Sequence, residues 1–539
     1  SPLGEHFVAK HGLTTGNVER CLRLWFEVNY PSIGFLQNSE KQFWENDYTW
    51  APHHKGGAFR KWYGNNDYVL GYNKFYNKLM DTFPGHRHDN PSFYFKEGIT
   101  WTDLTSGNFG ARYTPIGFTF DVSGPTGFAI DLDIYTTLGF MCSKVVAYFM
   151  NIMNPTMHFL VGQMNKLPVL DFEEANDVKA LVLRNIAISK EDWDDFETSW
   201  DFQIHPLITK EEATKDIRTV SNKSLVDNYS LWRDKCDKRF EELKENEEKI
   251  NRIFINLYGL QAELSYEVDY KYITVRNAEP RRDIISLLSY AVGCMLGRYS
   301  HNKNGIIYAG GEWNIEKYST FIPDDDNVIP ITDEEYLEDD IVSRLCTWLK
   351  VVYGEETLEK NLDFIAKVLG NKGSSSREII RNYFLNDFFK DHCQTYSVTG
   401  SGKRPIYWLF DSGKQNGFKA LIYLHRYNAD TIGNLRIDYL HRMQRIYESE
   451  INRMQDMIDH STSAREAAQA TKRREKLTKQ LKECWEYDKK LAHLALSRIE
   501  LDLDDGVKVN YRKLQTGADG KFYEVLADSK NIMMKVKAR

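Results

Sequence analysis

The sequence lacks the patterns that mark membrane, secreted and zinc-binding proteins. No apolar run reaches the roughly 18 residues that span a bilayer, so we expect no membrane segment. The seven cysteines stand far apart without a Cys-x-x-Cys pair, which argues against a zinc ribbon or a disulfide framework and favours the reducing cytoplasm. No signal-peptide pattern is seen, and the first residues are Ser-Pro-Leu-Gly rather than Met. We therefore expect a fragment of a longer cytoplasmic protein.

The sequence also lacks an excess of positive charge. The net charge is −7, so a role in nucleic-acid binding would need a local basic face rather than general attraction. An apolar share of 42% and a charged share of 27% are typical of folded globular proteins. A chain of 539 residues is too long for one hydrophobic core, so we expect three or four domains.

Common enzyme and metal motifs are incomplete. The stretch "TGSGKRP" (399–405) resembles a phosphate loop but lacks the first glycine, and Arg404 replaces the Ser or Thr that would hold magnesium. "HRHD" (86–89) offers two histidines without an evident third ligand. "DLDD" (502–505) does not match a calcium loop. We predict neither a nucleotide-hydrolysing site nor a metal site.

One short stretch, "NPSFYF" (90–95), differs by one residue from the Asn-Pro-Pro-aromatic motif of adenine methyltransferases, in which the polar residue holds the flipped base and the ring stacks on it. Ser92 stands where the second proline belongs. A methyl donor also needs a strand, a Gly turn and a helix, and the 89 residues before Asn90 show no such unit. We therefore predict no catalytic residue in this chain.

Hydrophobic periodicity predicts an α+β protein: a mixed, strand-rich domain followed by long helices and a mixed α/β region with a helical hairpin. Residues 1–170 are rich in aromatics, Gly and Asn with short β-like runs. Within them, 137–153 has helical spacing and 161–170 looks extended. The predicted parts are a strand-rich domain (1–222), a long helix (223–265), a mixed α/β domain (266–432), a helical hairpin (433–500), and a C-terminal hairpin with tail (501–539). The C-terminal hairpin is expected to turn at Asp519-Gly520.

The predicted long helices carry apolar seams with steps of three and four residues, which indicate packing. The first seam comprises Cys236, Phe240, Leu243, Glu247, Ile250, Phe254 and Leu257. The hairpin seams comprise Leu440, Tyr447, Ile451, Met454 and Ile458 in one helix, and Leu477, Leu481, Cys484 and Leu491 in the other. "HSTS" (460–463) is the expected hinge. Between the seams, the acidic run 324–340 holds nine carboxylates and no base, so we interpret it as a solvated connector facing away from nucleic acid.

The stretch "HHKGGAFRKWYGNNDY" (53–68) combines cations, aromatic rings and amides. Arginine, lysine and asparagine are common readers of base edges, and further cations hold phosphates. A surface loop with buried aromatics would give the same composition. The candidate DNA-binding residues are Lys55, Arg60, Lys61, Trp62, Tyr63, Asn65, Asn66, Arg87, Arg112 and Lys144. We assign base reading to Arg60 and Asn65, and phosphate contacts to Lys55, Lys61 and Lys144, as a hypothesis.

Several long stretches together resemble the PglX family, the adenine-specific DNA methyltransferases of bacteriophage exclusion (BREX) systems. They are "GLTTGNVERCLRLWFEV" (12–28), "HHKGGAFRKWYGNNDYVL" (53–70), "FKEGITWTDLTSGNFGARYTPIGFTFD" (95–121), "CSKVVAYFMNIMNPTMHFLVGQMNKLPV" (142–169), "RRDIISLLSYAVGCMLGRYS" (281–300), "YAGGEW" (308–313) and "KRPIYWLFDSGKQNGFKALIYLHRY" (403–427). The resemblance covers nearly the whole chain in order, except the last dozen residues.

The resemblance implies that this chain is the C-terminal, target-recognition part of such an enzyme, with residues 1–222 as the DNA target-recognition domain and 223–265 as a long spacer helix. Its expected partners are double-stranded DNA, the N-terminal methyltransferase domain of the same protein and other BREX components. The chain itself is expected to bind no cofactor, and S-adenosylmethionine would bind the full-length protein. The long helices resemble the spacers of restriction–modification specificity subunits. The alternative function is a protein-interaction scaffold that docks other defence components.

Overall fold

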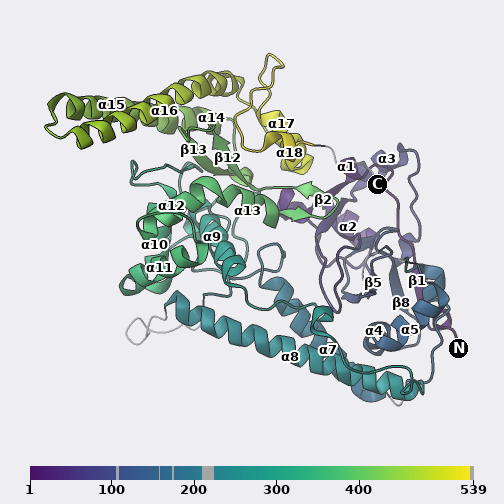
Figure 1. Cartoon of the computed structure of the whole chain (residues 1–539). Helices are drawn as coiled ribbons and strands as arrows, with labels where there is room; N and C mark the ends of the chain where they lie inside the picture. Colours follow the sequence, from purple (N-terminus) through teal and green to yellow (C-terminus); the bar gives the residue numbers. More distant parts are fainter. Residues whose placement is uncertain (105–107, 157, 173–174, 209–223, 535–539) are drawn as a thin grey trace. The chain divides into compact units, whose positions relative to one another are not determined.

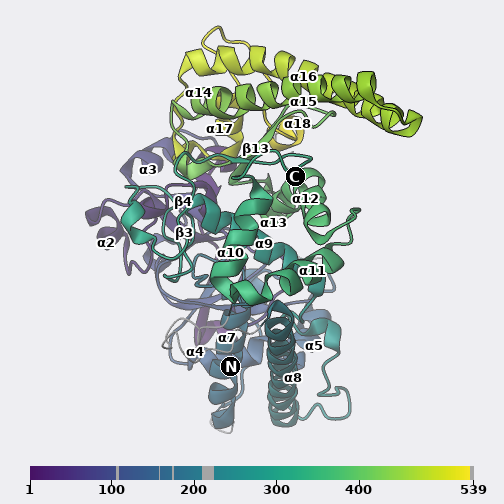
Figure 2. The ribbon, with the colours of Figure 1, turned by 90° about the vertical axis from the view of Figure 1, so that its left-hand side faces the viewer.

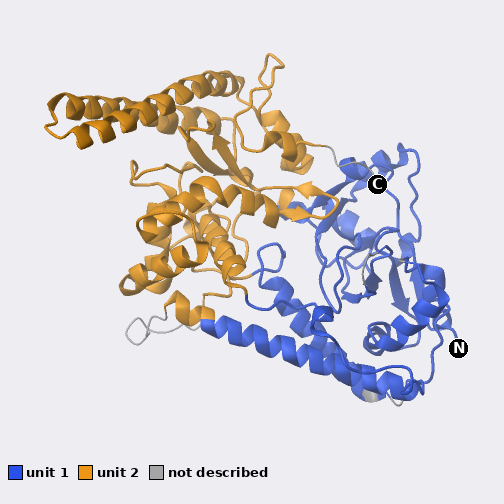
Figure 3. Ribbon diagram, in the orientation of Figure 1, with its two compact units in different colours: residues 1–25, 30–202, 230–278 blue, residues 26–29, 203–229, 279–539 orange. Residues whose placement is uncertain are grey.

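A computed structural model describes residues 1–104, 108–156, 158–172, 175–208 and 224–534, which form two compact units. Unit 1 comprises Ser1–Trp25, Tyr30–Phe202 and Ser230–Ala278, and unit 2 comprises Phe26–Asn29, Gln203–Tyr229 and Glu279–Arg539 (Figure 3). The chain thus passes from one unit to the other several times. Two units are a coarser division than the five predicted parts. The residue ranges of those five parts stay predictions.

Unit 1 contains two four-stranded sheets, as the strand-rich prediction for residues 1–170 requires. The first has the antiparallel order β1-β8-β5-β6 and the second the order β2-β4-β3-β7, with β3 and β7 parallel. The strands are β1 (Phe7–Lys10), β2 (Leu22–Leu24), β3 (Trp50–His54), β4 (Tyr68–Gly71), β5 (Gly98–Trp101), β6 (Ala111–Thr114), β7 (Thr119–Phe120) and β8 (Thr126–Ala129).

Helices lie beside these sheets in unit 1 (Figure 1). They are α1 (Val18–Cys21), α2 (Glu40–Glu45), α3 (Lys74–Asp81), α4 (Ile134–Met141), α5 (Lys144–Met153), α6 (Val161–Met164), α7 (Asn176–Asp194) and α8 (Leu225–Leu257), the last of which begins in unit 2. Trp101 of β5, Phe140 of α4, Val182 of α7 and Phe254 of α8 share one apolar cluster. Burial of such large side chains is the main driving force for this arrangement.

The seam predicted for the long helix is confirmed, because Leu243, Ile250 and Phe254 of α8 belong to that core. Glu247 lies in the same seam and is also buried. A carboxylate at a packed position needs a partner, and Lys61 and Trp62 both donate hydrogen bonds to it.

Unit 2 combines a bundle of helices with a small antiparallel sheet of order β12-β13-β9 and the two-stranded pair β10-β11. The strands are β9 (Ile329–Pro330), β10 (Ser397–Val398), β11 (Gly402–Lys403), β12 (Tyr407–Asp411) and β13 (Lys419–Tyr423). The helices are α9 (Pro280–Leu296), α10 (Ile341–Tyr353), α11 (Leu358–Leu369), α12 (Ser376–Asn386), α13 (Phe388–Thr395), α14 (Thr431–Asn434), α15 (His441–His460), α16 (Ala464–Ser497), α17 (Val507–Leu514) and α18 (Ser529–Ile532).

The helical hairpin is confirmed. Helices α15 and α16 run side by side in both views of the ribbon (Figures 1 and 2), and the break between His460 and Ala464 coincides with the expected hinge. Tyr447 and Met454 of α15 and the seam residue Leu481 of α16 are buried, as the spacing predicted. That the long helices act as spacers stays a prediction.

The prediction of a C-terminal hairpin is wrong in part. The run 507–514, expected as a strand of a hairpin, is helix α17, because Val507, Tyr511 and Leu514 are buried at helical spacing. The turn itself is present, since Thr516 and Phe522 form an antiparallel bridge around Asp519-Gly520. Residues 535–539 of the predicted tail lie outside the described residues.

The acidic run 324–340 is not a purely solvated connector, because it contains the buried strand β9. Its last residue, Asp340, is fully buried, caps α10 by accepting the Ser343 N–H, and pairs with Arg381 at 2.5 Å. The sequence showed a row of like charges, but the arginine that neutralises Asp340 lies 41 residues further along the chain.

Two expectations for the end of the first domain also change. The helical stretch 137–153 is divided into α4 and α5 where the Ser143 hydroxyl donates to the Phe140 carbonyl. The first part of the extended segment 161–170 is helix α6, because the Gln163 side chain accepts the Leu160 N–H.

The mixed α+β class is confirmed by two sheets with helices in unit 1 and a helical unit 2 with small sheets. All seven cysteines are free thiols. Among the described residues, no helix combines the length and apolarity that crossing a bilayer requires.

Candidate nucleic-acid interface

Most of the predicted DNA-binding residues lie in the segment between β3 and β4 of unit 1. This segment turns repeatedly, with positive φ angles at Gly56, Gly57, Trp62, Gly64 and Asn65. Such a backbone folds the segment back on itself, and its polar side chains are directed into the unit rather than into solvent.

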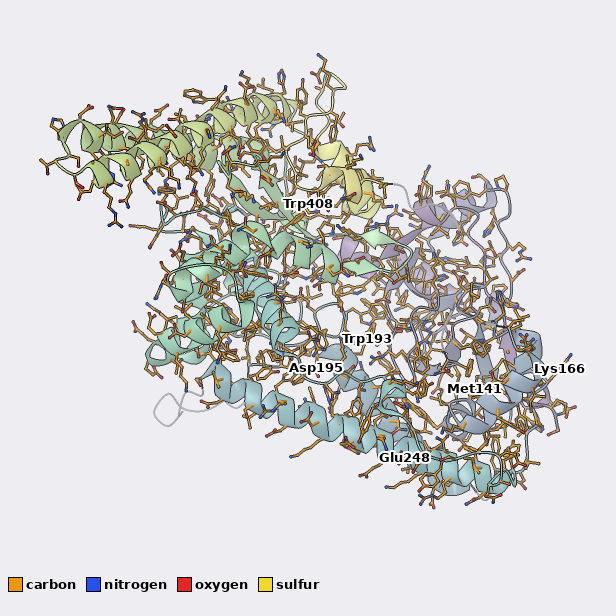
Figure 4. The ribbon with its side chains drawn as sticks, viewed as in Figure 1. Met141, Lys166, Trp193, Asp195, Glu248 and Trp408 are labelled. Carbon is orange, nitrogen blue, oxygen red and sulfur yellow. The ribbon has the colours of Figure 1, made fainter. Side chains whose placement is uncertain are left out.

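Arg60 is held by protein groups on all sides. The residue is 7% exposed, its guanidinium lies 3.2 Å from a carboxylate oxygen of Asp192, and it donates to the Ser189 carbonyl at 2.8 Å. The guanidinium carbon lies 5.0 Å from the centre of the Trp193 ring. Trp193 and Asp195 are labelled near the end of α7 in Figure 4. Arg60 therefore connects its loop to α7.

Asp192 is the centre of this network. It is fully buried, and besides Arg60 it accepts the backbone N–H of Arg276 at 2.9 Å and lies 3.8 Å from the Arg239 guanidinium. Burial raises the pKa of its carboxyl, but the neighbouring Arg276 and Arg60 outweigh burial, so the net pKa is below the usual range. Several cations around one buried carboxylate stabilise its charged form.

Lys61 and Trp62 share the second buried carboxylate. The Lys61 ammonium lies 2.7 Å from one oxygen of Glu247, and the Trp62 indole N–H donates to the other oxygen at 2.7 Å. Tyr63 is also buried, and burial raises the pKa of its phenol to about 12. These contacts join the loop to α8.

The remaining interior candidates are Asn65, Asn66 and Arg112. Asn65 donates to the Ala58 carbonyl at 2.8 Å, and Asn66 is buried. Arg112 is 1% exposed, and its Nε and Nη2 have no hydrogen-bond partner among the described residues. Burial, with the adjacent charge of Arg60, lowers the pKa of Arg112 to about 10.

The other three candidates have solvent access. Arg87 is exposed and lies 3.7 Å from Asp89. Lys55 is half-buried, and burial lowers its pKa despite the opposing charge of Asp121. Lys144 is half-buried at the start of α5, where its backbone N–H donates to Asn251. The structure thus places all ten candidates in unit 1, with seven in its interior, and their contact with DNA stays a prediction.

The stretch "NPSFYF" forms a small platform in unit 1 that the sequence analysis did not assign to DNA binding. Asn90 has a left-handed backbone (φ 56°), and its amide nitrogen donates to the His11 carbonyl at 2.8 Å. That amide nitrogen is engaged by the protein rather than poised to hold a base. The short helix Pro91–Phe93 follows and presents the ring of Phe93, which packs on Phe128 at 4.9 Å.

Two lysines lie over that ring. The Lys10 ammonium is 5.4 Å and the Lys96 ammonium 5.5 Å from the ring centre. Neither ammonium forms an ion pair within the described part of the chain. Lys10 ends β1 and Lys96 precedes β5, and β8 lies between these strands. We call Lys10, Phe93 and Lys96 the Phe93 platform.

No sequence signal pairs Lys10 with Lys96, because they meet only through the strand order. An aromatic ring attracts one cation by its quadrupole, but two unpaired cations on one ring also repel each other. An anion beside the ring would relieve that repulsion. The platform is therefore a candidate phosphate site in unit 1.

No family model matches the chain. Two curated proteins do. One, from Lacticaseibacillus casei (strain Zhang), is named "Adenine-specific methyltransferase PglX" and is 42% identical over 518 residues, which is 94% of this chain and 42% of that protein. The other, from Escherichia coli O9:H4 (strain HS), is named "Adenine-specific methyltransferase BrxX" and is 36% identical over 550 residues, which is 96% of this chain and 43% of that protein. Over nearly all of its length the chain is thus similar to part of the PglX and BrxX proteins. The predicted resemblance is confirmed.

The chain spans less than half the length of these two relatives. The names therefore describe proteins of which the matched region is less than half. The similarity covers almost all of the chain, so both units are shared with the family rather than one of them alone.

Proposed function

We propose that this chain recognises DNA for an adenine-specific methyltransferase of the BREX type. The supporting observation is the Phe93 platform: two unpaired lysines converge on one ring in a chain with a net charge of −7. The family relationship supports DNA as the macromolecule, because both relatives are named adenine-specific methyltransferases.

In this proposal the solvent-accessible cations and the buried cations have different roles. Lys10, Lys96 and Arg87 contact phosphates, because their charged groups reach solvent or lack an ion pair. The buried residues around Arg60 hold the segment between β3 and β4 in its shape. Arg60 and Asn65 remain the hypothesised base readers, which would require this segment to open when DNA binds.

The methyl-donor site is proposed to lie in the part of the protein outside this chain. Calorimetry of residues 1–539 with S-adenosylmethionine should then show no binding, and micromolar affinity would overturn this assignment. The same reasoning makes the methyltransferase domain and other BREX components the proposed partners, in the cytoplasm.

Fluorescence anisotropy of the 539-residue chain with a labelled duplex tests the proposal. Affinity should fall linearly with the logarithm of the salt concentration, because bound phosphates release counterions. The double variant Lys10→Ala/Lys96→Ala should weaken binding to all sequences alike and flatten that slope by about two ions.

Lys74→Ala/Lys78→Ala is the matched control, since it removes two exposed lysines from α3 of the same unit. Equal losses in both double variants would contradict a specific platform. Absence of DNA binding by the parent chain would favour the alternative function, a scaffold for other defence components.

A further inference from the structure

Helix α16 of unit 2 carries an excess of positive charge that its hairpin partner lacks. Residues 464–497 contain nine Lys and Arg against five Asp and Glu, whereas α15 contains three against four. If the hairpin were stabilised only by charge pairing, the basic residues of one helix would be matched by acidic residues of the other. The excess on α16 is therefore a feature to be explained.

The excess is concentrated on the outer face of the helix. Arg465, Lys472, Lys479 and Lys482 are exposed and form no ion pair with any residue between 224 and 534. Arg465, Lys472 and Lys479 are seven residues apart, so they lie on one face, and Lys482 follows one turn later. We call these four residues the α16 basic face.

Two of the five carboxylates of α16 are engaged by other parts of unit 2. Glu483 accepts hydrogen bonds from Ser412 and from the backbone N–H groups of Gln415 and Gly417. Asp488 pairs with Arg436 at 2.7 Å and with His441 at 3.0 Å.

Some charges near the basic face are already neutralised. Lys476 pairs with Asp333 at 3.0 Å, and Lys489 pairs with Glu486 at 2.9 Å. Glu475 is exposed among the lysines and offsets one of them. Glu483 and Asp488 thus serve contacts within unit 2, while the basic face keeps a net positive charge.

We propose that the α16 basic face binds the phosphate backbone of double-stranded DNA, as a second contact surface separate from the Phe93 platform. This inference rests on the proposed function, since it takes DNA as the partner. From Lys472 to Lys482 the helix advances about 15 Å, and along this length the face offers three lysines in a line, about two turns and then one turn apart. A polyanion with regularly spaced charges matches such a line.

The residue types favour DNA over an acidic protein. Lysine is a hydrated point charge suited to phosphate oxygens, whereas protein interfaces depend on buried aromatic and arginine anchors. From Lys472 to Lys482 the exposed residues are polar, and Trp485, at 50% exposure, only borders the face. Contacts of this kind carry no sequence information and add affinity to any duplex.

The triple variant Lys472→Ala/Lys479→Ala/Lys482→Ala in the full 539-residue chain tests the inference. The control variant Lys360→Ala/Lys367→Ala/Lys390→Ala removes three exposed lysines from α11 and α13 of the same unit. Both should melt like the parent, because the side chains are exposed. Anisotropy with a labelled duplex is measured over a range of salt concentrations for the parent and both variants.

The α16 variant should bind roughly tenfold more weakly at low salt, with a slope flatter by about two to three ions, while the control matches the parent. The loss should be equal for duplexes of unrelated sequence. Unchanged binding by the α16 variant overturns this inference and leaves the proposed function standing, provided that Lys10→Ala/Lys96→Ala still weakens binding.

Two other outcomes also overturn the inference about the α16 basic face. Equal losses in the α16 and control variants would assign the effect to net charge alone. Unchanged DNA binding with a lost affinity for poly-glutamate would identify the basic face as a site for an acidic protein. If the parent chain binds no duplex, both this inference and the proposed function fail.

Discussion

The loop 55–66 of unit 1 and helix α16 of unit 2 both place a cation at about every fourth residue, but the two regions use these charges in opposite ways. In the loop, Arg60 and Lys61 are buried against Asp192 and Glu247. On α16, Lys472 and Lys479 stand in solvent without an ion pair among the described residues. A cluster of cations in a sequence therefore does not reveal whether its partner is the protein itself or another molecule. The position of the carboxylates decides this.

The largest loss of stability is expected when a buried seam residue is replaced by a charged residue that has no partner. Leu243→Asp in α8 and Leu481→Asp in α16 each bury a carboxylate in an apolar cluster or seam. Each should lower the free energy of unfolding by more than about 4 kcal/mol, measured by urea denaturation. If both variants unfold like the parent but lose a partner protein, the seams are docking surfaces and the scaffold function gains support.

Arg60→Ala tests whether Arg60 serves as a buried structural ion pair or as a contact to a DNA base. Removing the guanidinium leaves Asp192 with one partner fewer, and breaking a buried ion pair should lower the stability by about 3 kcal/mol. Urea denaturation of the chain measures this.

Methylation-aware sequencing of cells that carry Arg60→Ala in the longer protein adds a second readout. If Arg60 reads a base, its removal should relax the methylated motif at one position and weaken DNA binding by about 1–3 kcal/mol. A variant of parental stability with a blurred motif would show that the buried contacts are not the main role of Arg60. An unchanged motif and extent of methylation would remove it from the base readers.

The acidic run gives a prediction about pH. Burial, with the hydrogen bond and like charge of Asp326, raises the pKa of Asp324 to about 8. The folded state therefore retains a proton that the unfolded state loses near pH 4, so stability falls as the pH rises from 4 to 8 and levels off above 8. Asp326→Asn removes the like charge and should flatten this fall by about 1 kcal/mol. Melting temperatures of parent and variant between pH 5 and about 9 measure it, and parallel curves would contradict the assignment.

The smallest expected effect is that of Lys144→Ala, at the half-buried start of α5. Stability should change by less than about 0.5 kcal/mol, because no ion pair is lost. Binding to all duplexes should weaken alike, with a salt slope flatter by about one ion. An unchanged slope would remove Lys144 from the proposed phosphate contacts.

Much of the fold follows from local patterns. The seams of α8, α15 and α16 and the hinge after His460 were predicted because apolar residues recur every three to four positions. The helix at 507–514 was missed because the turn residues Asp519-Gly520 suggested a hairpin, although Val507, Tyr511 and Leu514 have helical spacing. Strong turn signals do not determine the structure of the segments that lead to them.

The candidate site depends on contacts that no local pattern contains. Trp62 and Arg60 looked suited to bases and phosphates, but their partners Glu247 and Asp192 are more than a hundred residues away in the chain. Lys10 and Lys96 were not predicted for the same reason, since strand β8 brings their strands together.

The sequence by itself determined the mixed α+β class, the long amphipathic helices and the resemblance to the PglX family, since these depend on residue order and spacing within single segments. Only the tertiary structure decided which cations are neutralised inside unit 1 and which stay exposed on the Phe93 platform and the α16 basic face. The physical reason is that charge compensation acts through space: a lysine's availability depends on the nearest carboxylate, and strand order and helix packing bring that carboxylate from distant parts of the chain.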